Sequence, residues 1–517
     1  EMNSIPTDPV LSCESSISFE KHFFGGDEIK EWQIMTRAGQ AIGDALLRDM
    51  RELRTISHRP NLLVLVGKGH NGGDALIAAR RFLRTIPTAR AFVFPICKWE
   101  DCRPLTQRAW KELEDLAEKR IQLIDPSKDS LDQLKQVVLN NDFNAQVDGF
   151  LGMQGKLPLR DPLPSIIQFL NQSDKIAVRI AVDMPTGVTG DGTENPLRAD
   201  FTYCTGIVKE PVLLSSNADS VGRIRYLDLD FFAESEHDEC KLRVLRPDTL
   251  RKLRRLRQVD RDKRTHGHLF LLGGSRDLGG AVMMAAQAAL KAGVGLLTVG
   301  VPESLHSSFV ARLPEAMWVP LPETPDGFLA LEGLGRVRHS LDKATSLAIG
   351  PGIGKGIETQ SLVRETCNFF DGSTLLDADA LQPEIFQKLK NKQNLVITPH
   401  SGEFDRLSGG QKSVEWIKNY SCTLVLKGSH SKIFTSELQI ISLGGSSVLA
   451  RGGSGDLLSG ILGALLAKKT FSHLEAACLA VQWHGRAAEA LARQHGQESV
   501  LTTEILNYLS TAIRNDI

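Results

Sequence analysis

The feature that most constrains this chain is an alternation between short apolar runs and segments with helical periodicity. In the first half, a long amphipathic segment at 27–54 is followed by apolar runs and amphipathic segments in turn: runs at 61–67, 91–97, 145–151 and 176–185, segments at 73–83, 105–119 and 164–171, and one further strand and helix before 140. Runs that are apolar nearly throughout are typical of parallel strands buried on both faces. The pattern predicts a three-layer α/β domain with a parallel sheet.

A second strand and helix series begins at 268. Its predicted strands lie at 268–273, 295–300, 346–350, 373–377, 394–398 and 422–427, and its predicted helices at 281–292, 456–468 and 474–493. Between the two series the chain turns acidic from 231 to 240 and then basic from 251 to 264. A chain of 517 residues is too long to fold around a single hydrophobic core. We therefore expect two α/β domains, 1–240 and 241–517.

Composition excludes several classes of function. Lys plus Arg (61) nearly cancels Asp plus Glu (62), and the basic run at 251–264 contains no aromatic residue for base stacking. We interpret that run as a solvated helix face and connector, and expect no nucleic-acid partner. The eight cysteines form no C-x-x-C pair, and no apolar stretch is long enough to span a bilayer. With no signal-peptide pattern at its start, the chain is expected to be cytoplasmic, without a membrane partner.

The most informative motif is RGGSGDLLSG at 451–460. Glycines at 452, 453 and 455 come directly before an apolar helix, which leaves free backbone N–H groups at the helix start for an anion. Asp456 lies at that helix start, where the helix dipole stabilises a carboxylate without any catalytic role. Beside a phosphate site, it could also take a proton from an attacking hydroxyl. We favour the catalytic interpretation because the glycines permit close backbone approach to a phosphate.

Other short motifs follow predicted strands of the second series: GGS at 273–275, GPGIG at 350–354, DADAL at 377–381, TPHSGEF at 398–404 and LKGSHS at 426–431. Ligands of open α/β sheets gather at the carboxyl ends of strands. The GPGIGKG segment lacks Walker A spacing, so a P-loop is not expected. His266 and His268 have no cysteine or carboxylate at ligand spacing and are interpreted as non-ligands.

The first half carries its own glycine-rich loop. GKGHNGGD at 67–74 lies between a predicted strand and a predicted helix, and Asp148 and Asp183 each end a later strand. Such a loop permits phosphate approach, and carboxylates at strand ends are candidates for acid–base work. Asn71 could instead favour a left-handed turn, and the aspartates could cap helices.

In this order, the motifs of the second half closely resemble the ribokinase-like NAD(P)H-hydrate dehydratases over 245–510. The resemblance implies that Ala281, Gly352 or Gly354, and His400 contact the hydrated nicotinamide nucleotide, together with Asp456 as catalytic base. A lone histidine such as His400 is more often structural, and only its place in the set favours binding. The resemblance also implies a nucleotide donor, ADP used with Mg²⁺, held by Lys427, Gly428, Ser429, His430, Ser431 and Gly455.

The first half resembles the NAD(P)H-hydrate epimerases, with a Rossmann-like fold, over 28–230. The shared motifs are IMTRAG at 34–39, GxGHNGGD, VDxxLG and DxPTG. The resemblance implies a K⁺ site at Asn71, Asp148 and Thr186, and a catalytic Asp183. Its implied substrate contacts are His70, Asn71, Gly72, Gly73, Asp74, Gly152, Met153, Gln154, Gly155, Lys156, Leu157, Pro158 and Asp183.

These resemblances imply repair of NADH and NADPH hydrates. Phosphorylation turns the poor C6 hydroxyl leaving group into a good one, so a kinase-like fold can drive dehydration of the S hydrate and release AMP and phosphate from ADP. The first domain would interconvert the R and S hydrates, and a homo-oligomer, a tetramer or larger, is expected. Two alternatives stay open: a small-molecule kinase, which shares the anion hole and the aspartate, and a first domain that binds nucleotide or a partner without catalysis. The second alternative draws on His70, Gly149 and Met153, where the family usually has other residues.

Overall fold

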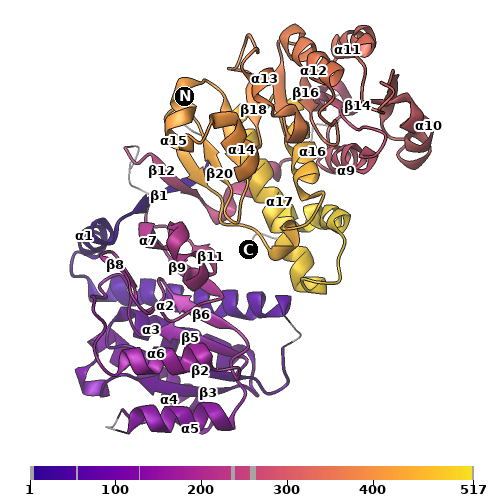
Figure 1. Cartoon of the computed structure of the whole chain (residues 1–517). Helices are drawn as coiled ribbons and strands as arrows, with labels where there is room; N and C mark the ends of the chain where they lie inside the picture. Colours follow the sequence, from indigo (N-terminus) through magenta and orange to yellow (C-terminus); the bar gives the residue numbers. More distant parts are fainter. Residues whose placement is uncertain (1–4, 54–55, 127–128, 234–238, 257–262, 515–517) are drawn as a thin grey trace. The chain divides into compact units, whose positions relative to one another are not determined.

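The structure is a computed structural model that describes residues 5–53, 56–126, 129–233, 239–256 and 263–514 (Figure 1). It divides into two compact units. The N-terminal unit is Asp8–Cys240, and the C-terminal unit is Lys241–Ile517 together with Glu1–Thr7. The first seven residues therefore group with the second half of the chain, whereas the expected first domain began at residue 1.

The N-terminal unit is built on a seven-stranded sheet in which all pairings are parallel. Its strands, in spatial order, are β11 (Arg223–Leu227), β9 (Phe201–Thr205), β6 (Arg179–Val182), β5 (Ala145–Gly149), β2 (Asn61–Val66), β3 (Arg90–Pro95) and β4 (Ile121–Leu123). Outside this sheet, β1 (Thr7–Leu11) pairs in parallel with β10 (Val208–Lys209), and β7 (Val188–Thr189) pairs with β8 (Gly192–Thr193). The expected parallel α/β sheet is confirmed.

Helices cover both faces of this sheet. The unit contains α1 (Cys13–Phe24), α2 (Glu28–Asp49), α3 (His70–Thr85), α4 (Pro104–Ala117), α5 (Ser130–Asn140), α6 (Leu163–Gln172), α7 (Glu210–Leu213) and α8 (Ala218–Val221). Side chains of β2 alternate between two cores: Leu62 and Val64 pack with α2, α3 and α4, whereas Leu63 and Leu65 pack with α5 and α6. Burial of successive strand residues on opposite faces explains why the run from 62 to 66 is apolar throughout.

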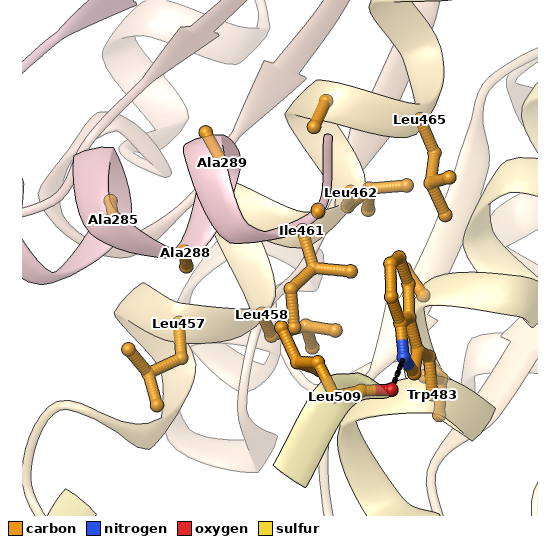
Figure 2. Close-up of a cluster of buried hydrophobic side chains, with 14 of the residues drawn as sticks. Ala285, Ala288, Ala289, Leu457, Leu458, Ile461, Leu462, Leu465, Trp483 and Leu509 are labelled. Carbon is orange, nitrogen blue, oxygen red and sulfur yellow. Dashed lines mark hydrogen bonds between the residues drawn. The ribbon is translucent and has the colours of Figure 1, made fainter. Parts of the chain in front are cut away.

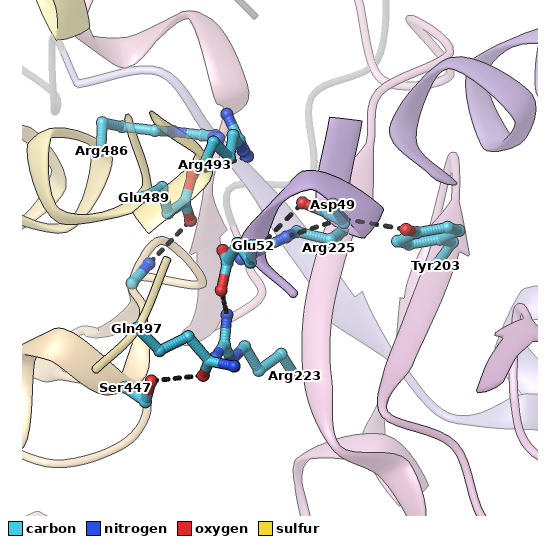
Figure 3. A network of polar contacts seen from close by, with 11 residues as sticks. Asp49, Glu52, Tyr203, Arg223, Arg225, Ser447, Arg486, Glu489, Arg493 and Gln497 are labelled. Carbon is cyan, nitrogen blue, oxygen red and sulfur yellow. Dashed lines mark hydrogen bonds and ion pairs between the residues drawn. The ribbon is translucent and has the colours of Figure 1, made fainter. Parts of the chain in front are cut away.

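A buried polar network ties α2 to the edge of the sheet (Figure 3). The Tyr203 hydroxyl donates to Asp49 at 2.9 Å, and Arg225 donates to the same carboxylate at 3.3 Å. Arg223 and Arg225 also pair with Glu52, which follows the end of α2. Because these carboxylates are buried, each needs such cationic partners. The network holds α2 in place, and α2 also forms part of the wall of a cavity in this unit.

The C-terminal unit contains a larger, mixed sheet. Its strands, in spatial order, are β12 (Leu242–Leu245), β21 (Gln439–Ile441), β20 (Lys432–Phe434), β19 (Thr423–Leu426), β18 (Leu395–Ile397), β17 (Ser373–Leu376), β16 (Ser346–Ile349), β13 (His268–Leu272), β14 (Leu296–Pro302) and β15 (Met317–Leu321). Pairing is antiparallel from β19 through β20 to β21 and parallel from β18 to β15. The carboxyl ends of β19, β18, β17, β16 and β13 therefore meet at one edge.

Two helical layers sandwich this sheet as well. The helices are α9 (Gly279–Lys291), α10 (Glu303–Arg312), α11 (Leu334–Leu341), α12 (Ile357–Phe369), α13 (Pro383–Phe386), α14 (Ser401–Ser408), α15 (Ser413–Trp416), α16 (Ser454–Ala467), α17 (His473–His495) and α18 (Leu509–Arg514). Figure 2 shows the core between α9 and α16, where Leu457, Leu458 and Ile461 lie near alanines of α9. A Cβ on Gly460 would lie 2.1 Å from the Ala285 carbonyl oxygen, so α16 can approach α9 this closely only with glycine there.

Several elements differ from the sequence expectations. The basic run was expected to form a helix face, but its described parts form short 3₁₀ turns at Pro247–Leu253 and Lys263–His266, and 257–262 lie outside the described residues. Proline at 247 and the charge of the run disfavour a longer helix. The strands β9, β11, β12, β15, β20 and β21 were not predicted at all. Among the described helices, none is long and apolar enough to cross a membrane.

Candidate active sites

A cavity of about 560 Å³ opens at the carboxyl end of the N-terminal sheet. One part of its wall is apolar and includes Phe24, Met35 and Phe231. The other part is polar and comes from five segments of the chain: Glu20 and Lys21 on α1, Lys68 to Asn71 with Asp74 at the start of α3, Leu151 to Gly155 after β5, Asp183 after β6, and Lys209 on β10. A cavity of this size with a few convergent polar groups fits a small organic ligand.

The glycines after β2 bring the backbone close to the next strand. A Cβ on Gly67 would lie 1.8 Å from the Phe150 carbonyl oxygen, and a Cβ on Gly72 would lie 2.1 Å from the Gly67 carbonyl oxygen. Gly69 has no atom near its missing Cβ. The first glycines thus fold the loop, and Gly69 leaves the N-terminus of α3 open toward the cavity.

His70 begins α3 beside Glu31. Its Nδ1 lies 3.4 Å from Glu31 Oε1. Burial, with a contribution from Arg103, lowers the pKa of His70 to about 4. The imidazole is therefore neutral at pH 7, so its contact with Glu31 is not an ion pair.

Asp183 and Lys209 form a buried ion pair on the cavity wall. Lys209 Nζ donates to Asp183 Oδ1 at 2.5 Å, and the lysine side chain is 1% exposed. Burial lowers the pKa of Lys209, but Asp183 and then Glu20 outweigh burial and the net pKa is raised. Asp183 also has a left-handed backbone with φ of 68°. Such strain in a non-glycine residue is common where a functional side chain must point in a fixed direction.

Two further carboxyl groups face the same pair. Asp74 is 8% exposed, and its Oδ1 has no hydrogen-bond partner among the described residues. Burial, then Asp183 and Glu20, raises the pKa of Asp74 well above its usual range. Burial also raises the pKa of Glu20 to about 7, with Lys209 opposing and Asp183 adding to the shift. Both carboxyl groups of this wall therefore favour the protonated form more than ordinary carboxyl groups do, as is common at functional sites.

Asn71, Asp148 and Thr186 meet around the backbone of Leu151. The Thr186 hydroxyl donates to Asp148 Oδ1 at 2.7 Å and accepts from the Leu151 N–H at 3.2 Å. Asn71 Nδ2 donates to the carbonyls of Val182 at 2.9 Å and Leu151 at 3.3 Å. Burial raises the pKa of Asp148 to about 6 against the hydrogen bonds from Thr186 and Phe150. Their side-chain and backbone oxygens lie close together.

The structure brings part of the predicted epimerase set to the cavity. His70, Asn71, Asp74, Gly152, Met153, Gln154, Gly155 and Asp183 line it. Gly72, Gly73, Lys156, Leu157 and Pro158 do not line it, and the first two are packed against neighbouring atoms. Sequence reasoning missed Glu20 and Lys209, which belong to no recognisable motif. The available signal for Lys209 was a lysine at the end of the apolar pair Ile207–Val208.

In the C-terminal unit, Asp456 lies in the first turn of α16. Gly453 caps this helix with φ of 89°, a conformation that favours glycine. Burial raises the pKa of Asp456 to about 7, with Asp377 adding, Lys427 opposing and Glu403 adding further. A carboxylate whose pKa lies near neutrality at a helix N-terminus is suited to general-base work.

Lys427, at the end of β19, is held by Asp377 at the end of β17. Lys427 Nζ donates to Asp377 Oδ1 at 2.7 Å, and the Ser459 hydroxyl on α16 donates to Oδ2 at 2.6 Å. A Cβ on Gly455 would lie 3.2 Å from Lys427 Nζ. The ammonium group therefore lies beside the open N-terminus of α16, where both favour an anion.

The other predicted residues of this site occupy neighbouring loops. Gly352 and Gly354 have φ of 66° and 75°, and a Cβ on Gly352 would lie 3.1 Å from the Ala281 Cβ. His400 caps α14, and its Nδ1 accepts from the Gly402 N–H at 3.1 Å. His400 thus has a structural role as a helix cap, and its half-exposed ring places Nε2 3.4 Å from Glu403 Oε1. Gly428 to Ser431 form the turn between β19 and β20.

Behind this site, Glu489 on α17 accepts from the Gly445 N–H at 2.8 Å (Figure 3). Arg486 and Arg493 pair with the same carboxylate. Its side chain is fully buried, so the arginines offset the cost of burying the charge. The contact anchors the loop after β21 to α17.

Fold and sites together define a two-site α/β enzyme, with acid–base groups around a cavity in one unit and an anion site beside a carboxylate in the other. One family model, described as NAD(P)H-hydrate dehydratase, matches residues 269–511, and another, described as YjeF-related protein N-terminus, matches residues 31–210.

Full-length relatives agree with both matches. The bifunctional NAD(P)H-hydrate repair enzyme of Gloeobacter violaceus is 32% identical over 495 residues, which is 89% of each chain. The enzyme of the same name from Escherichia coli is 29% identical over 502 residues, 94% of this chain and 90% of that one. The chain belongs to the family of bifunctional NAD(P)H-hydrate repair enzymes. It is a dehydratase and epimerase, as the sequence predicted.

Solved structures resemble the second half. A ribokinase-like superfamily protein from Enterococcus faecalis is 28% identical, with a TM-score of 0.47, and the match covers 53% of this chain and 96% of that one. The ADP/ATP-dependent NAD(P)H-hydrate dehydratase of Bacillus subtilis, co-crystallised with ATP and Mg²⁺, is 27% identical, with a TM-score of 0.45, and covers 53% and 98%.

Proposed function

We propose that the C-terminal unit moves a phosphoryl group from ADP to the C6 hydroxyl of the S hydrate, with Asp456 as the base. Asp456 takes the hydroxyl proton as the oxygen attacks phosphorus, and AMP leaves. The ring nitrogen lone pair then expels phosphate from C6 to form a C6=N bond, and loss of a proton from C5 to solvent forms the C5=C6 bond, returns the lone pair to nitrogen and restores NADH or NADPH. The observation that carries this proposal is the position of Lys427 Nζ beside Gly455, one residue before Asp456.

The proposed nucleotide site consists of Lys427 to Ser431 and Gly455. Lys427 supplies an ammonium group, and the start of α16 supplies unpaired N–H groups for the phosphates. The proposed hydrate contacts are Ala281, Gly352, Gly354 and His400. These loops follow β13, β16 and β18, whose carboxyl ends lie at the same edge as β19.

The donor set of this site fits Mg²⁺. Within the described part of the chain, no cluster of three histidine, cysteine or acidic side chains is present to enclose a metal ion. Mg²⁺ usually keeps several waters and binds through substrate phosphates and one or two carboxylates. Glu403, whose negative charge adds to the raised pKa of Asp456 and whose carboxylate also accepts from the His400 N–H, would be a protein ligand. When bound, the ion would neutralise charge on the phosphates.

For the N-terminal unit, we infer epimerisation of the R and S hydrates in the 560 Å³ cavity. Its apolar wall accommodates the nicotinamide ring, and Asp183 supplies acid–base chemistry at C6. The predicted contacts that line the cavity are His70, Asn71, Asp74 and Gly152 to Gly155, and they surround the same space.

The K⁺ site is proposed at Asn71, Asp148 and Thr186. Neutral and carboxylate oxygens are suitable ligands for this cation, and the carbonyls of Leu151 and Val182 lie within reach of Asn71. The bound ion would hold the loops after β5 and β6 together.

One assay tests both functions. Purified protein is incubated with mixed hydrate epimers and either ADP or ATP, with Mg²⁺, and recovery of the reduced nicotinamide absorbance is followed. Complete recovery is expected, because epimerisation feeds the R hydrate to the dehydratase. The epimerase function would be contradicted if, once the S hydrate is consumed, further recovery is no faster than the uncatalysed epimerisation of the R hydrate. Oligomerisation to a tetramer or larger stays a prediction, to be checked by analytical ultracentrifugation.

A further inference from the structure

The carboxyl group of Glu20 faces the cavity from helix α1, outside the segment that matches the family model. Glu20 is half-buried, and among the described residues no side chain or backbone group forms a hydrogen bond or ion pair with it. A half-buried carboxyl that lines a cavity without a partner is available to a ligand.

The surroundings of Glu20 favour the protonated form. The titratable and charged groups that face this part of the cavity are Lys21 on its own helix, Glu31 on α2, His70 and Asp74 on α3, Asp183 after β6, Lys209 on β10, and Lys68 and Arg103. Lys209 already pairs with Asp183 at 2.5 Å. Burial and the negative charges nearby raise the pKa of Glu20 to about 7 despite Lys209. At neutral pH, Glu20 therefore has a proton to donate in a substantial fraction of molecules.

Inversion at C6 by loss and return of the hydroxyl uses two proton-transfer groups. The hydroxyl must leave from one face of the ring and return to the other, so one group donates a proton as the C6–O bond breaks and another accepts a proton as the new bond forms. Glu20 and Asp183 come from different elements, α1 and the turn after β6, and the Lys209 ammonium group interacts with both carboxyl groups.

We propose that Glu20 is the second catalytic acid–base residue of the epimerase site, acting together with Asp183. Glu20 donates its proton to the C6 hydroxyl, the C6–O bond breaks, and water leaves as the ring nitrogen lone pair forms the C6=N bond. Water then adds to the opposite face of C6, and Asp183 accepts its proton while the nitrogen regains its lone pair. Substrate and product have the same composition, and solvent returns the proton from Asp183 to Glu20. This inference rests on the proposed epimerase function.

The test uses the full chain in H₂¹⁸O, with the variant E20Q and the matched control E14Q, whose exposed carboxyl lies on the same helix. Wild type is expected to incorporate ¹⁸O at C6 as it interconverts the epimers, measured by mass spectrometry. E20Q is expected to lose both R-to-S conversion and ¹⁸O incorporation by a factor on the order of 10² to 10⁴. E14Q should match wild type, and E20D should recover part of the rate.

Thermal unfolding followed by circular dichroism, compared between E20Q, E14Q and wild type, reports whether the N-terminal unit of E20Q remains folded, and dehydration of pure S hydrate reports that the C-terminal unit is unaffected. If E20Q keeps more than about a tenth of wild-type conversion, Glu20 is not the acid. If wild type interconverts the epimers without ¹⁸O uptake, the C6–O bond does not break and the inference is overturned while the epimerase function stands. If wild type does not interconvert the epimers at all, both are overturned.

Discussion

The ammonium group of Lys427, after β19, lies 2.7 Å from Oδ1 of Asp377, after β17, and the other oxygen of this carboxylate accepts from the Ser459 hydroxyl on α16. Asp377 is 2% exposed, so removing the lysine leaves a buried carboxylate without its cation. We expect Lys427→Met to lower the free energy of unfolding of the C-terminal unit by about 3 to 5 kcal/mol. Denaturant unfolding measures this loss.

The double variant Lys427→Met/Asp377→Asn provides the control. It should recover part of the lost stability because the buried charge is gone, yet it should bind nucleotide no better than the single variant. Full stability in the single variant would contradict the role given to the pair.

Asp456 governs the expected pH dependence of dehydration. A base acts in its ionised form, and the Asp456 pKa of about 7 means that the ionised fraction rises as pH rises through 7. We expect kcat/KM for the S hydrate to increase about tenfold per pH unit below that value and to level off above it. Asp456→Asn should lower turnover by a factor on the order of 10² to 10⁴ and remove the rising limb. Retention of the limb would assign it to another group.

The nucleotide donor is a separate question. We expect ADP to support faster turnover than ATP, and removal of Mg²⁺ with EDTA to abolish turnover with either, since the phosphate charges would then face the site unscreened. Initial rates at matched nucleotide concentrations decide between the donors. Equal or faster turnover with ATP would reject the preference for ADP.

Substitutions in the buried Asp183–Lys209 pair of the N-terminal unit should reduce or abolish epimerisation and leave dehydration intact. Asp183→Ala should stop R-to-S conversion while the S hydrate is still dehydrated, because the two activities use different units. Lys209→Arg should keep part of the conversion. Lys209→Met should lose it, with a fall in kcat that is larger than the rise in KM, because the lysine orients Asp183. Separate kcat and KM values for each variant check this, and a change in KM alone would indicate a merely structural lysine.

The proposed K⁺ site predicts an ion-specific defect. Asp148 accepts hydrogen bonds from the Thr186 N–H at 2.8 Å and from its hydroxyl at 2.7 Å. Asp148→Asn removes the charged ligand and disturbs these bonds, so epimerisation should need more K⁺ and the N-terminal unit should lose about 1 to 3 kcal/mol of stability. Titration with KCl, with NaCl at matched ionic strength as control, measures the change. An unaltered K⁺ requirement would move the site elsewhere.

The sequence predicted strands best where both faces are buried. β2 and β13 are apolar after their first residues, Asn61 and His268, because helices cover them on each side. The strands β9 (FTYCT) and β11 (RIRYL) were missed because polar residues interrupt their apolar pattern, and Arg225 is buried only through its pairing with Asp49 and Glu52. Pairing of this kind is tertiary and leaves no local signal.

The residues of the candidate sites likewise fall into those with a local sequence signal and those without one. Glycine-rich loops carry a local signal, so the sequence pointed to the loops that hold Gly67, Gly72 and Asp456, although Gly72 packs against the Gly67 backbone and does not line the cavity. Glu20 and Lys209 were not found, because a glutamate on an amphipathic helix and a single lysine have no special spacing. Only folding shows that both face Asp183.

Lys209 pairs with Leu11 in the short parallel ladder between β10 and β1, and α1 begins two residues after Leu11. One ladder therefore sets the position of both the lysine that holds Asp183 and the helix that carries Glu20. A chain shortened to begin at Glu28 would retain the seven-stranded sheet and the glycine-rich loop, and it would still be recognised by sequence searches. It would nevertheless lack one wall of the cavity, so recognisable family motifs are an incomplete guide to whether such a shortened enzyme can turn over.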